Sequence, residues 1–204
     1  MEKSALILLT VNFMLVALLP VIFFRRDGKL TLMWLLTAAP WGIAPALFIS
    51  QYFGILEHPM VIADSVFYTW MSSIGSVLSA ISIGLIAMTM GSHRIPLALW
   101  HQNPQDDAPS TIVTWGSYKY IRHPFYTAFI LAFIACILIA PHWSILILGI
   151  YTMVMLNHTA SKEERRLCNE EGQFGQEYRE YMKHTGRFFP KFTARRGALQ
   201  TQSN

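Results

Sequence analysis

The stretch "LIAPHWSIL", residues 138–146, lies at the centre of a block without Asp, Glu, Lys or Arg that extends from His123 to Ser161. About 20 apolar residues in a helix cross the hydrocarbon core of a bilayer, so this block has nearly the length of two crossings. Pro141 and His142 interrupt it, because proline lacks the amide hydrogen that a helix interior needs. The stretch therefore predicts a tight hairpin of two membrane helices.

Three more blocks without charged residues precede this hairpin, at 4–24, 30–56 and 65–92. The predicted fold class is thus an all-α integral membrane protein with five transmembrane helices, the fourth and fifth forming the hairpin, and a cytoplasmic helical C-terminal tail. We expect one membrane-embedded domain at 1–192 and a disordered C-terminus at 193–204. The predicted spans are at about 4–24, 30–53, 65–90, 122–140 and 143–162, with the tail at 163–192.

Composition and charge agree with a membrane protein. The chain is 53% hydrophobic and only 14% charged, whereas soluble domains carry about 25% charged residues. Basic residues gather in "RRDGK" at 25–29 and in the tail, while the loop with Glu57 and Asp64 has none. The positive-inside rule then predicts a multi-pass protein, in a cell inner membrane, with its N-terminus outside and its C-terminus cytoplasmic.

Two classes of partner are disfavoured. The net charge of +4 is modest and spread along the chain, so membrane lipids explain it better than nucleic acid does. Cys136 and Cys168 lack the Cys/His spacing of a zinc site, so we expect no metal.

Polar residues gather just before the fourth predicted span, in "TIVTWGSYKYIRHPFY" at 111–126. Taken singly, each has an ordinary explanation: His123 can cap a helix that starts at Pro124, tyrosines favour membrane interfaces, and Arg122 can snorkel to the headgroups. The tail adds Glu163 and Glu164, two carboxylates that are unfavourable beside an anionic surface. They predict a cationic partner, either Arg122 and His123 or a bound positively charged cofactor.

Both regions resemble one protein family. The first is similar to the "L-V-T-x-G-x-Y-x-x-x-R-H-P-x-Y" signature of membrane isoprenylcysteine carboxyl methyltransferases. The tail, "KEERRL…FGQEYREYMKHTGRFFP", resembles the family's "E-E-x-x-L…F-G-x-x-Y-x-x-Y…R-x-x-P" block. The resemblance covers about residues 110–190 and implies a five-helix methyltransferase that uses S-adenosylmethionine. Its partner would be a lipophilic small molecule or lipidated substrate at the membrane–cytoplasm interface, methylated on a carboxylate, thiol or amine.

The resemblance also implies a set of site residues. Glu163 and Arg187 are the expected catalytic residues, and His158 and Thr159 are expected to contact the substrate. Relatives that methylate prenylcysteine usually carry an arginine where this chain has Thr159, so prenylcysteine is expected to be a poor acceptor. The expected cofactor contacts are Gln102, Ser110, Thr111, Ile112, Val113, Tyr118, Arg122, His123, Pro124, Phe125, Tyr126 and Glu163.

Two alternatives remain open. Membrane sterol reductases, which use a nicotinamide cofactor, carry an "R-H-P-N-Y-x-G-E" motif, but this chain reads "RHPFYTAF" and has Phe129 in place of the acid. A non-enzymatic membrane adaptor would leave the cluster of Tyr118, His123 and Glu163 unexplained.

Overall fold

A computed structural model describes residues 3–24, 32–56, 64–92, 112–169 and 174–191, and its regular secondary structure in these residues is helical. This confirms the all-α prediction for the described part of the chain. A helix occupies most of each of the first three charge-free blocks, and the fourth block holds two, separated at Pro141. The elements are α1 (Lys3–Phe24), α2 (Leu32–Tyr52), α3 (Ser65–Ser92), the 3₁₀ turn η2 (Gly116–Lys119), α4 (Pro124–Ile139), α5 (Trp143–Cys168) and α6 (Gly175–His184).

Among the described residues, α3 and α5 are long and apolar enough to cross a membrane. The five-span topology, its orientation and the single domain stay predictions. Helix α5 continues past residue 162, where the predicted span ends, to Cys168. Charged residues such as Lys162 and Arg165 are good helix formers, so the helix extends into the predicted helical tail. Both glutamates of the tail therefore lie on the last turns of α5.

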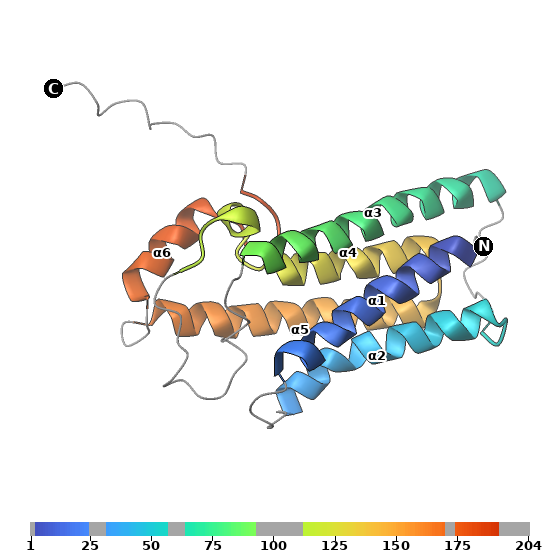
Figure 1. The fold of residues 1–204 in the computed structure, drawn as a ribbon, viewed down its shortest axis with the longest axis horizontal. Coiled ribbons are helices and arrows are strands. Elements are labelled where there is room, and N and C mark those ends of the chain that lie inside the picture. The colour runs from blue at the N-terminus through green and yellow to red at the C-terminus, as the bar shows by residue number, and fades with distance from the viewer. Residues whose placement is uncertain (1–2, 25–31, 57–63, 93–111, 170–173, 192–204) are drawn as a thin grey trace, which may run out of the picture.

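The helices α1 to α5 run alongside one another, and α6 and η2 lie together at one end of them (Figure 1). Aromatic side chains from three helices fill the centre. The ring of Phe13 from α1 lies 5.0 Å from that of Phe133 of α4, and Trp41 of α2 lies 4.2 Å from Phe129. Phe13 and Phe133 are almost fully buried, so these contacts hold α4 in the middle of the bundle.

Helix α3 packs closely on α4 through small residues. A Cβ on Gly75 would lie 2.7 Å from Cγ1 of Ile139, so glycine permits the close approach. The hydroxyl of Ser82 donates to the carbonyl of Ala128 at 2.8 Å. Small residues and interhelical hydrogen bonds are the usual means of joining helices in lipid, where apolar burial offers little driving force.

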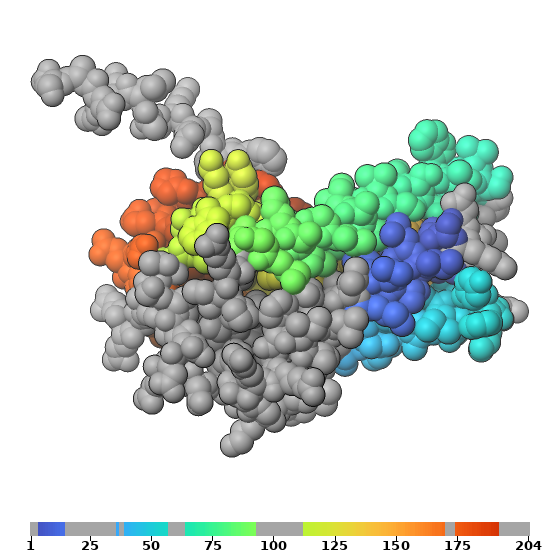
Figure 2. Space-filling view, viewed as in Figure 1, coloured from blue at the N-terminus to red at the C-terminus, as the bar shows by residue number. Residues whose placement is uncertain are grey.

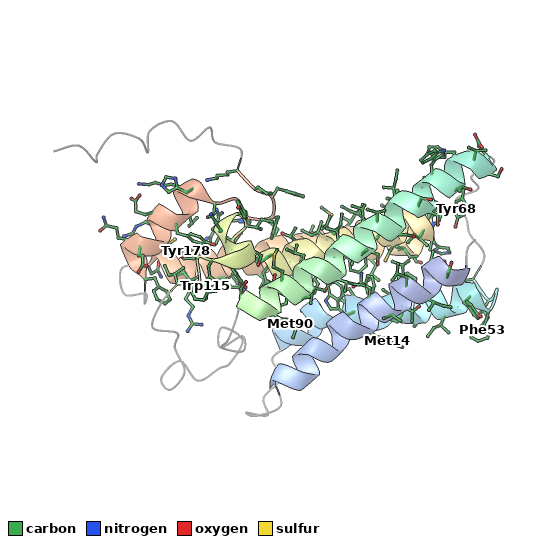
Figure 3. All side chains as sticks on the ribbon, turned by 45° about the horizontal axis from the view of Figure 1, so that its top comes forward. Met14, Phe53, Tyr68, Met90, Trp115 and Tyr178 are labelled. Atoms are coloured by element: carbon green, nitrogen blue, oxygen red, sulfur yellow. The ribbon has the colours of Figure 1, made fainter. Side chains whose placement is uncertain are left out.

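The outer surface of the bundle is apolar. Trp70 and Val77 on α3 and Ile147 and Val154 on α5 are each at least 60% exposed. A surface of this kind favours contact with lipid, in agreement with a membrane protein. Figure 3 shows the labelled Tyr68 and Met90 at the two ends of α3, and Trp115 and Tyr178 beyond the Met90 end. The polar elements thus gather at one end of an apolar bundle.

Candidate functional site

The segment before α4 turns back against the end of α3. Gly116 has a φ of +62°, which L side chains rarely adopt, and a Cβ there would lie 2.0 Å from Oγ of Ser92. The next residue, Ser117, is buried and its hydroxyl lies 3.1 Å from that of Thr89. Only glycine fits this turn, which places Tyr118 and the residues after it beside α3.

The C-terminal segment docks on the residues that precede α4. The amide of Arg122 donates to the carbonyl of Gly186 at 2.8 Å, and the amide of His123 donates to the carbonyl of Arg187 at 3.1 Å. In return, the amide of Gly186 donates to the carbonyl of Tyr120 at 3.2 Å. These bonds join two segments more than 60 residues apart. Figure 2 shows η2 and α6 side by side on the surface at this end.

Glu164 is the centre of a buried group of charges. It is 3% exposed, and its Oε1 accepts from Nε of Arg122 at 2.9 Å. Arg187 donates to it through Nε, at 3.1 Å from Oε2, and through Nη2. The Nε2 of His123 lies 3.2 Å from Oε1. Three chain segments therefore meet at one carboxylate, and the cationic partners predicted from within the chain are present.

Glu163 faces the other side of the same imidazole. Its Oε1 accepts from the hydroxyl of Tyr126 at 2.7 Å, and its Oε2 lies 3.4 Å from Nδ1 of His123. An imidazole with a carboxylate at each nitrogen can donate to both only as the imidazolium. With His123 charged, the five groups of Arg122, His123, Arg187 and the two glutamates carry one net positive charge.

The side chain of Glu163 is 20% exposed, against 4% for that of Glu164. The ring of Tyr126 stacks on that of His123 with the centroids 5.2 Å apart. His123 is the residue before α4, but its side chain makes no capping hydrogen bond. The capping explanation for this histidine therefore does not account for its side chain, which is held between the two glutamates.

Tyrosines of the 3₁₀ turn and of α6 close this end of the molecule. The hydroxyl of Tyr181 donates to the carbonyl of Tyr118 at 2.6 Å. Burial raises the pKa of Tyr181 to about 12 and that of Tyr118 further, so both are neutral at physiological pH. The rings of Tyr178 and Tyr181 on α6 lie 5.6 Å apart.

The other predicted site residues occupy varied positions. Pro124 is buried, and Ile112, Val113 and Phe125 are half-buried. His158 is exposed, while Thr159 is half-buried and its hydroxyl donates to the carbonyl of Met155 at 2.9 Å. The expected cofactor contacts Gln102, Ser110 and Thr111 lie outside the described residues.

The sequence did not predict that Arg187 contacts two polar residues of α5. Nη1 of Arg187 donates to Oδ1 of Asn157 at 2.8 Å and to Oγ of Ser161 at 3.1 Å. Asn157, Ser161 and Glu164 are spaced four and three residues apart, so they share one helix face. That spacing was visible in the sequence, but the partner from the distant tail was not.

An apolar groove of about 370 Å³ lies beside the docked tail. It lies on the α3 side of α4, next to Phe188, whose carbonyl accepts from the hydroxyl of Thr127 at 2.7 Å. Its lining residues are Ile81, Leu85, Met88, Ile121, Thr127, Leu131, Phe188, Phe189 and Pro190.

These features define a helical membrane protein with a buried charged cluster at one end of an apolar bundle. Residues 98–169 match the model of the isoprenylcysteine carboxyl methyltransferase (ICMT) family. The match agrees with the resemblance that the sequence motifs indicated, over a segment that is less than half of the chain. It supports a membrane methyltransferase and does not favour the reductase alternative. No curated protein matches the chain significantly.

Proposed function

We propose that this protein transfers a methyl group from S-adenosylmethionine to a lipophilic acceptor at the membrane–cytoplasm interface. The observation that carries the proposal is the contact of His123 and Tyr126, at the start of α4, with Glu163 of α5. These residues come from the two blocks that resemble the family signature. They lie at the polar end of a bundle whose sides are apolar, where a water-soluble donor and a lipophilic acceptor can meet.

The residues present fit the chemistry of this cofactor. S-adenosylmethionine, when bound, supplies a methyl group on a sulfonium and also carries an ammonium and a carboxylate. Glu163 is partly exposed and offers an anion to the positive groups. The net positive charge of the cluster around His123 favours the carboxylate. Tyr118 and the segment at Ile112 and Val113 remain proposed contacts.

Roles for the arginines follow from their contacts. Arg122 is 7% exposed and donates to Glu164 and to the carbonyls of Met182 and Thr185, so its contribution to cofactor binding would be mainly electrostatic. Arg187 is 32% exposed. It remains, with Glu163, a proposed catalytic residue, because an exposed guanidinium edge can approach a bound ligand.

The acceptor is proposed to differ from prenylcysteine. Thr159 supplies no positive charge, and its hydroxyl is bonded within α5. The groove beside Phe188 offers an apolar surface near the site for the acceptor's hydrocarbon part. Incubation of the purified protein with labelled S-adenosylmethionine and N-acetyl-farnesylcysteine tests this: we expect little methyl ester, and efficient formation would contradict the inference from Thr159.

Binding calorimetry in detergent tests the activity class. We expect the wild type to bind S-adenosylhomocysteine and not reduced nicotinamide dinucleotide. Loss of one charge-assisted hydrogen bond, about 1.5–3 kcal/mol, should weaken binding about tenfold or more in His123→Ala and in Glu163→Ala. Glu177→Gln, an exposed change on α6, is the control. Unchanged affinity in both site variants would contradict the site, and preferential binding of the nicotinamide would favour a reductase.

A further inference from the structure

The two adjacent glutamates at the end of α5 have different surroundings. Among the described residues, Glu163 contacts His123, which precedes α4, and Tyr126 in its first turn. Glu164 contacts that motif through Arg122 and also the C-terminal segment through Arg187. Among the described contacts, Glu164 is thus the carboxylate of α5 that binds both the segment before α4 and the C-terminal segment.

Removal of this carboxylate would affect the two arginines unequally. Arg122 would keep two carbonyl acceptors, those of Met182 and Thr185. Arg187 would keep only neutral acceptors on α5, Asn157 and Ser161. A buried ion pair that loses one partner leaves an uncompensated charge, which is strongly unfavourable. The contact of Arg187 with α5 is therefore the one that should weaken, while Arg122 keeps its bonds to Met182 and Thr185 of the C-terminal part.

Hydrogen bonds to backbone carbonyls couple the position of the segment Gly186–Phe188 to the position of the site. The carbonyls of Gly186 and Arg187 accept from the amides of Arg122 and His123, and the carbonyl of Phe188 accepts from Thr127. Movement of this segment would remove the bonds that orient the backbone on both sides of His123.

We propose that Glu164 is a positioning residue that latches the segment Gly186–Phe188 onto α5, with Asn157 directing the guanidinium of Arg187. The latch holds His123 in place for ligand binding, so the inference rests on the proposed function. Glu164 acts through His123 and Arg187 and does not itself contact the reacting groups. Glu164 is more buried than Glu163 and, among the described residues, has more charged partners.

Tryptic cleavage after Arg187, followed by mass spectrometry of the full-length protein in detergent, measures the latch directly. Loss of the charged bonds in Glu164→Gln should raise the initial cleavage rate about tenfold or more. Glu164→Asp, which keeps the charge, should restore part of the protection. Glu163→Gln is the matched control and should remain within about twofold of the wild type, because Glu163 does not contact Arg187. Equal acceleration by both glutamine variants would overturn the proposal.

Asn157→Ala provides a second variant, because Asn157 is exposed and its loss does not threaten folding. We expect about threefold faster cleavage and weaker binding of S-adenosylhomocysteine at an unchanged melting temperature. Unchanged cleavage in this variant and in Glu164→Gln would overturn the latch. If the wild type fails to bind S-adenosylhomocysteine, the proposed function fails, while the cleavage contrast still decides the latch.

Discussion

Gly186 is the position where the smallest substitution should have the largest local effect. It lies in the docked C-terminal segment, and a Cβ at this position would lie 1.6 Å from the carbonyl oxygen of Phe189 and 2.8 Å from its carbonyl carbon. Both obstacles are backbone atoms, which cannot rotate away as the end of a side chain can. Gly186→Ala should therefore open the turn between residues 186 and 189.

The size of the effect follows from the bonds at risk. Real Cβ contacts are essentially never shorter than 3.0 Å, so the turn must open by about 1.4 Å. Such a shift breaks hydrogen bonds that are 2.8 to 3.2 Å long between this segment and residues 120–123. Three backbone bonds at about 0.5–1.5 kcal/mol each give about 1.5–4.5 kcal/mol. The undocked fraction should then rise about tenfold to a thousandfold.

Hydrogen–deuterium exchange in detergent measures this undocking. We expect faster exchange of the amides of Arg122 and His123 in Gly186→Ala, with weaker binding of S-adenosylhomocysteine and unchanged exchange in α3 and α4. Gly91→Ala is the matched control, because a Cβ there meets no atom within 4 Å. If the amides of Arg122 and His123 exchange as slowly in Gly186→Ala as in the wild type, the predicted undocking is refuted.

Two more substitutions test the site and the bundle. Tyr126→Phe removes the hydroxyl that donates to Glu163 at 2.7 Å and should weaken S-adenosylhomocysteine binding about two- to tenfold by calorimetry; equal affinity would exclude a role for this bond. Gly75→Leu places atoms where even a Cβ lies 2.7 Å from Ile139, and we expect a loss of about 1–3 kcal/mol, seen as a lower melting temperature in detergent. Gly84→Leu, in open space, is its control, and equal melting of the two variants would contradict close packing of α3 on α4.

The helices were predictable from sequence because long charge-free blocks are strong signals. The break between α4 and α5 was equally clear, since α4 ends at Ile139 and α5 begins at Trp143, on either side of Pro141. The role of His142 was not predictable: its Nδ1 accepts from the amide of Ser144 at 3.1 Å and caps α5. A capping bond depends on the local backbone angles, which residue type alone does not set.

The sequence predicted which residues form the site better than it predicted which of them contact each other. The sequence indicated that the carboxylates of the tail would meet a cationic partner, either Arg122 and His123 or a bound cofactor, and Arg122 and His123 do contact them. Which glutamate would be buried depends on the rotation of α5 about its axis, since neighbouring helical residues point about 100° apart. The pairing of Gly186 with Tyr120 and Arg122 is an isolated contact of a few residues, too short to leave a periodic pattern in the sequence.

The faces of α5 decide whether Arg187 can replace the arginine that relatives carry at the position of Thr159. At about 100° per residue, Thr159 and Glu163 lie within about 40° of each other, whereas Asn157 lies about 160° from Thr159. Arg187 is bound to the face with Asn157 and Glu164, so its charge lies away from Thr159. We therefore expect Thr159→Arg to gain methylation of N-acetyl-farnesylcysteine over the wild type in the labelled assay. Thr159→Gln, which adds a longer side chain without a charge, is the control, and an equal or absent gain in the two variants would show that the charge at position 159 does not select the acceptor.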